Sequence, residues 1–283
     1  MIDYIHAAAE GEALLAAAGV PEAKTDARLL LEYVCGTDAS MIYREPDRIL
    51  HESEKEHYFA LIERRRKREP LQYITGRQYF FGLEFEVDKR VLVPRPDTEI
   101  LVESVLESSA GGKLLDLCTG SGCIPVSLLK KGSFSEAVAA DLSPEALELA
   151  ERNAEKLGVK ERLHFHEGDL YDALPEEYKG SFDVLTANPP YIESSVIPGL
   201  MPEVSEYEPK MALDGGTDGL DLYRRIIAEA PLWLKTGGRI FLEIGCRQAQ
   251  PVLSLLAENG FTQCGVRKDY ASLDRVVCGE YME

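Results

Sequence analysis

The chain has 283 residues, of which 45% are hydrophobic and 28% are charged, and its formal net charge is −18. This length suits one large domain together with a small one. The composition is typical of a soluble globular protein, and no apolar run approaches the roughly 20 residues that span a bilayer. Residues 1–95 contain 14 Lys and Arg against 17 Asp and Glu, so the remaining residues carry −15, which disfavours the basic channel that nucleic-acid enzymes use to neutralise phosphates.

The amino terminus and the cysteines bear on the cellular compartment. The opening sequence MIDYIHAAAEGEALLAAAG has no basic leader and carries Glu10 and Glu12, so we expect no secretory signal and a cytoplasmic protein. The six cysteines include no C-x-x-C pair and adjoin no histidine cluster. We therefore expect reduced thiols, no disulfide framework and no metal site.

Residues 1–76 are predicted to form a small helical domain. Ala27, Leu30, Leu31 and Val34 recur at the spacing of one helix face, and Gly36 follows as a stop signal. Strand patterns are absent from this region, which closes at Glu69-Pro70. The basic run at 64–68 is interpreted as the solvated end of a helix, with a partner-binding role as the alternative.

Residues 77–96 are predicted to link this domain to the next through a β-hairpin. The apolar side chains from Phe81 to Val87 alternate with polar or small ones, as in a strand with one wet face. Asp88-Lys89-Arg90 is predicted to turn this strand back into Val91-Leu92-Val93.

Residues 97–283 alternate between strand and helix patterns and predict an α/β domain. Asp97 is expected to cap a helix that runs to Ser108, and Ser143-Pro144 to begin another that runs to Leu157. Repeated βα units imply a mostly parallel sheet with helices on both faces, followed by an antiparallel pair in the tail from Phe261 to Gly279. The expected strands are 113–118, 137–140, a short one before Gly168, 182–187 and 239–244.

Polar residues follow three of these strands, where ligands of parallel sheets bind. The turn Asp116-Leu117-Cys118-Thr119-Gly120-Ser121-Gly122 resembles a nucleotide-binding turn but lacks the full G-x-G-x-x-G pattern. Asp141 follows about 20 residues later, where an acid can accept hydrogen bonds from ribose hydroxyls. Asp169 is placed to meet an adenine edge and Leu170 the ring face, although an Asx turn would also explain Asp169.

The segment Asn188-Pro189-Pro190-Tyr191 follows the predicted strand at 182–187. It combines a side-chain amide, carbonyls held by two prolines and an aromatic face, which together suit a planar nitrogen-bearing group. A plain proline turn is the alternative interpretation.

This combination resembles the S-adenosylmethionine-dependent amino-methyltransferases. The segments 68–76, 91–99, 208–220 and 274–277 are similar to the release-factor glutamine methyltransferases, the HemK/PrmC family, and the similarity runs from the helical domain to the carboxyl terminus. The resemblance implies a Rossmann-like class I methyltransferase domain that uses S-adenosylmethionine, yields S-adenosylhomocysteine and methylates the glutamine of the Gly-Gly-Gln motif in peptide chain release factors 1 and 2. It implies no membrane or nucleic-acid partner, and we expect a monomer whose helical domain recognises the body of the release factor.

Roles for the site residues follow from the resemblance and from the chemistry. We expect Cys118, Thr119, Gly120, Ser121, Gly122, Asp141, Asp169, Leu170 and Asn188 to bind the cofactor, and Asn188, Pro189, Pro190 and Tyr191 to bind the substrate and carry catalysis. Asn188 Oδ1 and the Pro189 carbonyl would accept the amide N–H bonds, and Tyr191 would pack against the flat amide.

Several flanking residues allow two interpretations. Arg95 and Glu99 either form a surface ion pair or lie near the cofactor, as the resemblance implies. Glu208, Asp214 and Asp218 either order a lid over the substrate or are solvated. The alternative functions are an amino-methyltransferase acting on adenine or guanine in nucleic acid or on a ribosomal protein glutamine, and a module that binds the cofactor without catalysis.

Overall fold

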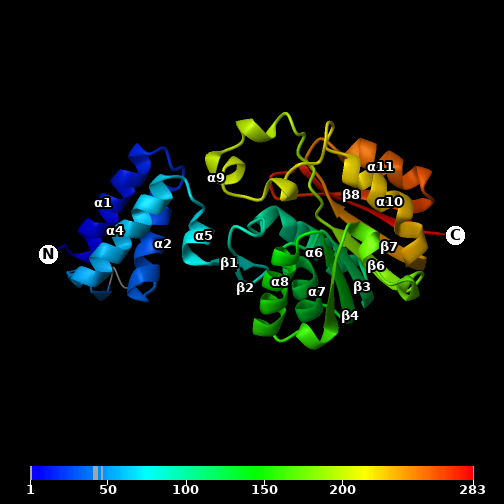
Figure 1. Cartoon of the computed structure of the whole chain (residues 1–283), viewed down its shortest axis with the longest axis horizontal. Helices are drawn as coiled ribbons and strands as arrows, with labels where there is room; N and C mark the ends of the chain where they lie inside the picture. The colour runs from blue at the N-terminus through cyan, green and yellow to red at the C-terminus, as the bar shows by residue number, and fades with distance from the viewer. Residues whose placement is uncertain (1, 41–43, 46, 283) are drawn as a thin grey trace. The chain divides into compact units, whose positions relative to one another are not determined.

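The computed structural model describes the whole chain except residues 1, 41–43, 46 and 283. The chain divides into two compact units (Figure 1). The helical unit comprises the chain up to Arg77 together with Met201–Tyr207, and the α/β unit comprises Gln78–Leu200 and the chain from Glu208 onward. Within the described ranges, no helix is both long enough and apolar enough to cross a membrane.

The helical unit is built as the apolar periodicity predicts. Its helices are α1 (Tyr4–Ala17), α2 (Ala23–Cys35), α4 (Glu52–Arg66), α5 (Leu71–Thr75) and the short α9 (Pro202–Ser205). Asp3 caps α1 by accepting a hydrogen bond from the amide of His6, and α2 ends at Gly36 in the left-handed conformation. The helices enclose a core that includes Tyr4, Leu15, Leu30, Leu31, Tyr58 and Ile62.

The prediction of a solvated basic run at 64–68 is wrong for Arg65. Its side chain is only 7% exposed and lies 2.7 Å from Asp26 and 2.8 Å from Glu203. Arg68 also pairs with Glu203, at 2.5 Å. A buried guanidinium needs such partners because it cannot lose its charge, so the helical unit holds the segment around Glu203 by ion pairs.

The hairpin lies earlier in the chain than predicted. It pairs β1 (Arg77–Phe80) with β2 (Leu83–Glu86) through the turn Phe81-Gly82, both of whose residues have positive φ. Two consecutive residues with positive φ form the tight hairpin turn whose twist matches that of the flanking strands. The alternation of apolar residues in the sequence does not reveal where such a turn lies. Val91-Leu92-Val93 forms no strand, and Val91 and Leu92 line a pocket described below.

The α/β unit confirms the predicted sheet. Seven strands lie in the order β5-β4-β3-β6-β7-β9-β8, and all are parallel except β9, which runs antiparallel to both β7 and β8. The strands are β3 (Gly112–Leu117), β4 (Phe134–Asp141), β5 (Leu163–Glu167), β6 (Phe182–Ala187), β7 (Leu234–Glu243), β8 (Phe261–Lys268) and β9 (Asp274–Tyr281).

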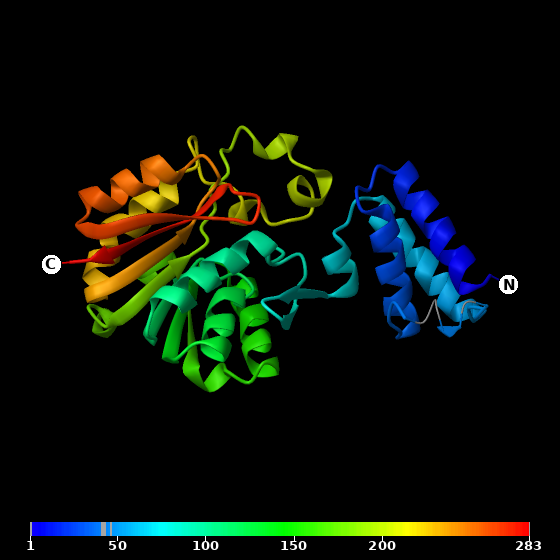
Figure 2. The same ribbon diagram turned by 180° about the vertical axis from the view of Figure 1, so that it is seen from behind.

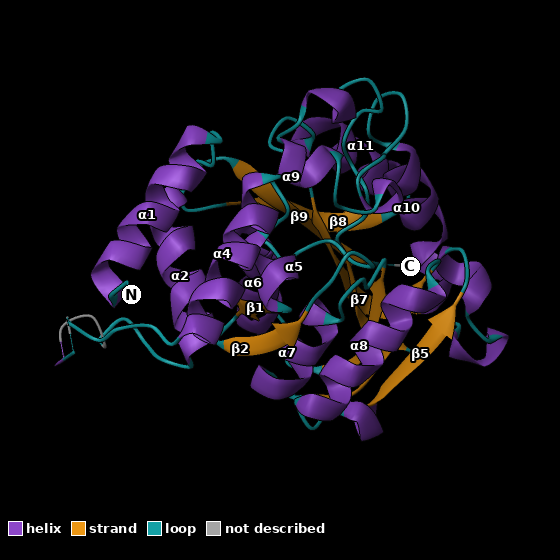
Figure 3. Ribbon diagram, turned by 60° about the vertical axis from the view of Figure 1, so that its left-hand side comes forward, coloured by secondary structure: helices purple, strands orange, loops and turns teal. Residues whose placement is uncertain are grey.

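Helices cover both faces of this sheet (Figures 1 and 2). Figure 3 shows the helices in purple and the strands in orange. The helices α6 (Pro96–Ser108), α7 (Cys123–Lys131) and α8 (Pro144–Lys156) pack on one face. The other face is covered by α10 (Asp221–Trp233) and α11 (Ala249–Glu258). Short 3-10 turns occupy Lys160–Arg162, Leu170–Ala173, Glu176–Tyr178, Ile197–Gly199 and Lys210–Ala212.

The caps of two helices test the sequence predictions. Ser143 caps α8 by accepting a hydrogen bond from the amide of Ala146, as predicted. The predicted capping role of Asp97 is wrong, because α6 begins at Pro96 with Arg95 in the cap position. Proline fixes φ for a first helical turn, and the Asp97 carboxylate instead lies 3.0 Å from Arg275.

Strand order places the functional edge of the sheet. From β3 the chain moves outward through β4 to β5, then returns to β6 on the other side of β3. Loops leaving β3 and β6 therefore diverge, and a crevice opens at their carboxyl ends. The glycine turn and Asn188 both lie there.

Candidate active site

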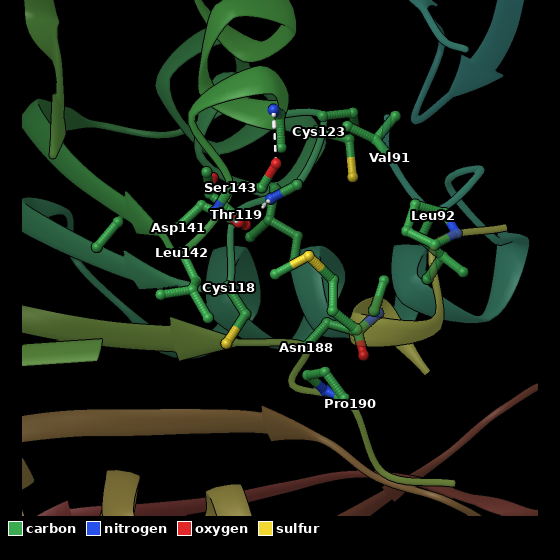
Figure 4. A pocket seen from close by; sticks show the side chains of 18 of the residues that line it. Val91, Leu92, Cys118, Thr119, Cys123, Asp141, Leu142, Ser143, Asn188 and Pro190 are labelled. Atoms are coloured by element: carbon green, nitrogen blue, oxygen red, sulfur yellow. Dashed lines mark hydrogen bonds between the residues drawn. The ribbon is translucent and has the colours of Figure 1, made fainter. Parts of the chain in front are cut away.

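A pocket opens at the carboxyl ends of β3, β4 and β6 (Figure 4). Of the predicted site residues, it is lined by Cys118, Thr119, Gly120, Ser121, Asp141, Asp169, Leu170, Asn188 and Pro190. Gly122, Pro189 and Tyr191 do not line it. Its apolar side chains include Leu142, Ile124 and Leu222, which suit the face of an aromatic ring.

The turn after β3 is shaped by unusual backbone angles. Cys118, Gly120 and Gly122 have φ of 57°, 54° and 77°, the left-handed region that non-glycine residues rarely adopt. A Cβ on Gly120 would meet no protein atom within 4 Å, so it would project into the open pocket, whereas one on Gly122 would lie 3.2 Å from Ala150 Cβ on α8. Gly120 thus leaves room for a ligand, and Gly122 lets the turn approach α8.

Asp141 ties the glycine turn to the end of β4. Its Oδ2 accepts a hydrogen bond from the Gly120 amide at 2.8 Å, and its Oδ1 accepts one from the Ser143 amide at 2.9 Å. Burial raises the pKa of this carboxyl, while the backbone N–H groups lower it. Each carboxylate oxygen has a further lone pair, which a ribose hydroxyl can use.

Asp169 and Leu170 follow β5 and reach the same pocket. Leu170 is buried with a positive φ of 53°, which turns its side chain inward. The Asp169 carboxylate is half-exposed and lies 2.9 Å from the Arg225 guanidinium. Its second oxygen remains an acceptor for an exocyclic amine.

The segment after β6 presents its residues in different directions. Asn188 and Pro190 face the pocket in Figure 4, and Pro189 is buried. The Asn188 Nδ2 group donates a hydrogen bond to Thr98 Oγ1 at 3.3 Å, and no hydrogen bond to Oδ1 is formed within the described chain. That arrangement leaves a carbonyl-type acceptor available to a ligand.

Tyr191 points away from the pocket, into the sheet. Its hydroxyl donates a hydrogen bond to Glu243 Oε1 at 3.2 Å, and burial raises its pKa above the ordinary value. The Tyr191 hydroxyl is therefore un-ionised and serves to anchor the turn.

Two residues next to this segment were missed by sequence reasoning. Thr98, at the start of α6, lines the pocket, and Glu243 ends β7 with only 1% of its surface exposed. Burial raises the pKa of Glu243 to about 7. The signal available in the sequence was Glu243 itself, a charged residue within the otherwise apolar segment Phe241-Leu242-Glu243-Ile244-Gly245. A buried acid is rarely found without a partner, so its presence there indicates a specific role.

A glycine-rich loop supports the segment from outside. Ile192 N donates a hydrogen bond to Leu213 O at 3.0 Å, and Gly215 N donates one to Ile192 O at 2.9 Å. A Cβ on Gly215 would lie 2.7 Å from Tyr191 Cα, so no other residue fits there without movement. Gln248 Nε2, also missed from the sequence, donates a bond to Tyr191 O at 3.0 Å.

The flanking charged residues have different partners in the structure. Arg95 and Glu99 do not pair with each other. The Arg95 guanidinium lies 2.5 Å from Glu208 Oε2, and Glu99 Oε1 accepts a hydrogen bond from the Phe81 amide at 2.7 Å. Glu208 is buried, and its Oε1 accepts a bond from the Val93 amide at 3.1 Å, so the solvated interpretation of Glu208 is wrong.

The two remaining acids of this loop lie nearer the surface. Asp214 Oδ1 accepts a hydrogen bond from Ser194 Oγ at 2.5 Å and another from the Gly216 amide at 3.1 Å. Asp218 pairs with Arg224 on the exposed side of α10. Asp214 therefore helps to close the glycine-rich loop, while Asp218 is partly solvated.

Comparisons with known proteins agree with this architecture. Residues 6–76 match the family model described as the PrmC N-terminal domain, and residues 108–268 match a methyltransferase domain. A release factor glutamine methyltransferase of Geobacter sulfurreducens is 43% identical over 94% of this chain and 92% of its own length. A protein of the same name from Clostridium acetobutylicum is 42% identical over 89% of both chains. A methyltransferase structure from Pyrococcus furiosus is 19% identical with a TM-score of 0.55, covers 72% of this chain and 91% of its own, and supports the fold alone.

Proposed function

The chain belongs to the release factor glutamine methyltransferase family, and we propose that it methylates the glutamine side-chain nitrogen in the Gly-Gly-Gln motif of peptide chain release factors 1 and 2. The observation that carries this proposal is the placement of Asn188 in the pocket at the end of β6, with Nδ2 donating to Thr98 and Oδ1 left as an acceptor. A primary amide offers two N–H donors, and Asn188 Oδ1 is a matching acceptor.

The pocket fits the cofactor, S-adenosylmethionine, that the family uses. Gly120 leaves open space where a side chain would stand, and Asp141 has acceptor capacity for a ribose diol beyond its two backbone bonds. Leu170, Leu142 and Ile124 provide apolar surface for the adenine ring. When bound, the cofactor supplies an electrophilic methyl group on a sulfonium sulfur.

The chain's own residues then address the weak nucleophilicity of the substrate. A carboxamide nitrogen shares its lone pair with the carbonyl, so the site must fix the group and stabilise the positive charge that develops on nitrogen. Asn188 Oδ1 and the Pro189 carbonyl accept the two N–H bonds, and both bonds strengthen as that charge grows. Pro190 restrains the backbone that carries the Pro189 carbonyl.

Gly120, Asp141 and Leu170 would hold the cofactor that supplies the methyl group to the amide nitrogen, and the electron pair of the carbon–sulfur bond would stay on sulfur. The N-protonated amide is strongly acidic and loses its proton to water. No histidine or lysine is found among the described residues that line the pocket, and we assign its two carboxylates, Asp141 and Asp169, to the cofactor, so the proton passes to water.

We further propose that the helical unit recognises the body of the release factor, because a tripeptide loop gives little surface for binding. We propose that the reaction takes place in the cytoplasm, where release factors act, and that the enzyme is a monomer.

Isotope transfer tests this proposed function against its alternatives. The purified enzyme is incubated with methyl-labelled cofactor and, separately, with release factor 1, release factor 2, ribosomes, transfer RNA and DNA. Label is expected on both release factors and on no other substrate. Label that accumulates on a ribosomal protein or a nucleic acid, with unlabelled release factors, would refute the proposal.

A further inference from the structure

The buried carboxyl group of Glu243 lies next to the turn Asn188-Pro189-Pro190-Tyr191, and one of its two oxygens has no hydrogen bond within the described residues. Glu243 Oε1 accepts the hydrogen bond from Tyr191, whereas Oε2 is buried and has no hydrogen-bond partner in the part of the chain that the structure describes. Leaving a buried acceptor unsatisfied lowers the free energy of unfolding of the protein. Such a group is often retained for a functional reason.

Thr98 connects this carboxyl group to Asn188. It is buried at the start of α6, and its Oγ1 accepts the hydrogen bond from Asn188 Nδ2 at 3.3 Å. A hydroxyl has one proton and two lone pairs, so the Thr98 proton remains free for another acceptor. The Thr98 hydroxyl is close enough to Glu243 to lower the pKa of that carboxyl. Catalytic hydrogen bonds are often long before substrate binds, so the Thr98 hydroxyl is a candidate donor to Glu243 Oε2, which has no partner among the described residues.

We propose that Glu243 is a positioning residue for methyl transfer, which acts through Thr98 and Tyr191 to keep Asn188 Oδ1 turned toward the substrate amide. This inference rests on the proposed function. An ionised carboxylate only accepts hydrogen bonds, so it obliges Thr98 to donate to it. Thr98 Oγ1 must then accept from Asn188 Nδ2, which leaves Oδ1 directed at the pocket.

Replacing the carboxylate by an amide removes this fixed direction. A glutamine at position 243 can donate to Thr98, which can then donate to Asn188 Oδ1. The Asn188 amide would turn over and present Nδ2–H to the substrate, whose amide nitrogen also offers only N–H. Two donors facing each other lose the hydrogen bond that the transition state needs.

The charged and titratable groups around Glu243 determine the pH range in which its carboxyl group is ionised. Tyr191 and Arg275 lie beside its carboxyl and Asp97 approaches from α6, while the Tyr223 hydroxyl on α10 donates to the Glu243 backbone carbonyl at 2.7 Å. Cys123 on α7 is a weaker neighbour. Burial raises the pKa of Glu243 most, Asp97 raises it further, and Thr98, Arg275 and Tyr191 lower it. Because only the ionised form is a pure acceptor, turnover should rise as pH increases through about 7.

Four variants test the proposal with the full-length enzyme, S-adenosylmethionine and a Gly-Gly-Gln peptide. Glu243→Gln and Thr98→Val each remove one link at nearly constant volume, and Thr98→Ser restores the hydroxyl. Glu136→Gln, on the surface of β4 and 2.9 Å from Lys113, is the matched control. Thermal unfolding verifies that each variant is folded, and calorimetry gives the Kd for the cofactor.

We expect kcat to fall by about 30-fold or more in Glu243→Gln and Thr98→Val, with KM for the peptide and cofactor Kd within about threefold of wild type. Thr98→Ser and Glu136→Gln should stay within about threefold of wild type in kcat, and Glu243→Gln should lose the rise of turnover with pH. Normal kcat in Glu243→Gln, or a parallel loss of cofactor affinity, would overturn the proposal. A wild-type enzyme that methylates no Gly-Gly-Gln substrate would refute the proposed function itself.

Discussion

Gly215, which packs against the turn Asn188-Pro189-Pro190-Tyr191, offers a steric test of the site. In Gly215→Ala, the new Cβ would lie 2.7 Å from Tyr191 Cα and 2.8 Å from Pro190 O. Carbon atoms in contact normally stand about 3.5–4.0 Å apart, so the turn must move by nearly 1 Å. Gly215 is not among the residues with positive φ, so alanine adds no backbone strain of its own. The displacement therefore acts on the turn that carries Asn188.

A misplacement of about 1 Å at a reacting group can lower turnover by about 100-fold, and we expect that loss in kcat for Gly215→Ala. Gly199→Ala is the matched control, because it lies in the same long loop, also lacks positive φ and would meet no atom within 4 Å. Peptide methylation is followed by mass spectrometry, with cofactor Kd from calorimetry as a second readout. Equal kcat in the two alanine variants would refute the argument that the loop positions the turn.

Three further predictions concern buried or bonded charges. Asp141→Asn should weaken cofactor binding by about tenfold or more, because a charge-assisted acceptor for Gly120 is lost, and unchanged calorimetric Kd would contradict its role. Arg65→Met should lower the unfolding free energy of the helical unit by about 3 kcal/mol, since Asp26 loses its buried partner, and unaltered hydrogen exchange of α2 and α4 would count against it. Burial raises the pKa of Asp116 from 3.8 to about 7, so the folded state keeps a proton that the unfolded state loses, and the stability this contributes falls as pH rises from about 4 to about 7. Asp116→Asn cannot titrate, so its Tm relative to wild type should rise between about pH 4 and about pH 7, and a constant difference would show that Asp116 does not titrate in this way.

The sheet was predictable because its signals are local. Apolar runs bounded by glycine, proline and aspartate give the strands, and the cap at Ser143 depends on neighbours a few residues away. Polar residues at strand ends gather at one edge of a parallel sheet, which is why Asp141 and Asn188 could be expected to line one pocket.

What the sequence could not reveal depends on contacts between distant segments. Thr98 and Asn188 are 90 residues apart, and nothing local to Thr98 marks it as a hydrogen-bond acceptor for that amide. The burial of Arg65 depends on Glu203, 138 residues later, so a basic run that resembles a solvated helix end is partly a buried ion-pair cluster. The position of Tyr191 likewise depends on a distant residue, because its hydroxyl bonds Glu243 and its side chain does not line the pocket; its expected packing against the substrate amide stays a prediction.

Tandem mass spectrometry of intact release factors after reaction with the wild-type enzyme tests the central claim most directly. We predict a single added methyl group on the side-chain nitrogen of the Gly-Gly-Gln glutamine, formed by wild type and lost in Asn188→Ala while that variant still binds the cofactor. A methyl group at another residue, or normal methylation by Asn188→Ala, would contradict the account.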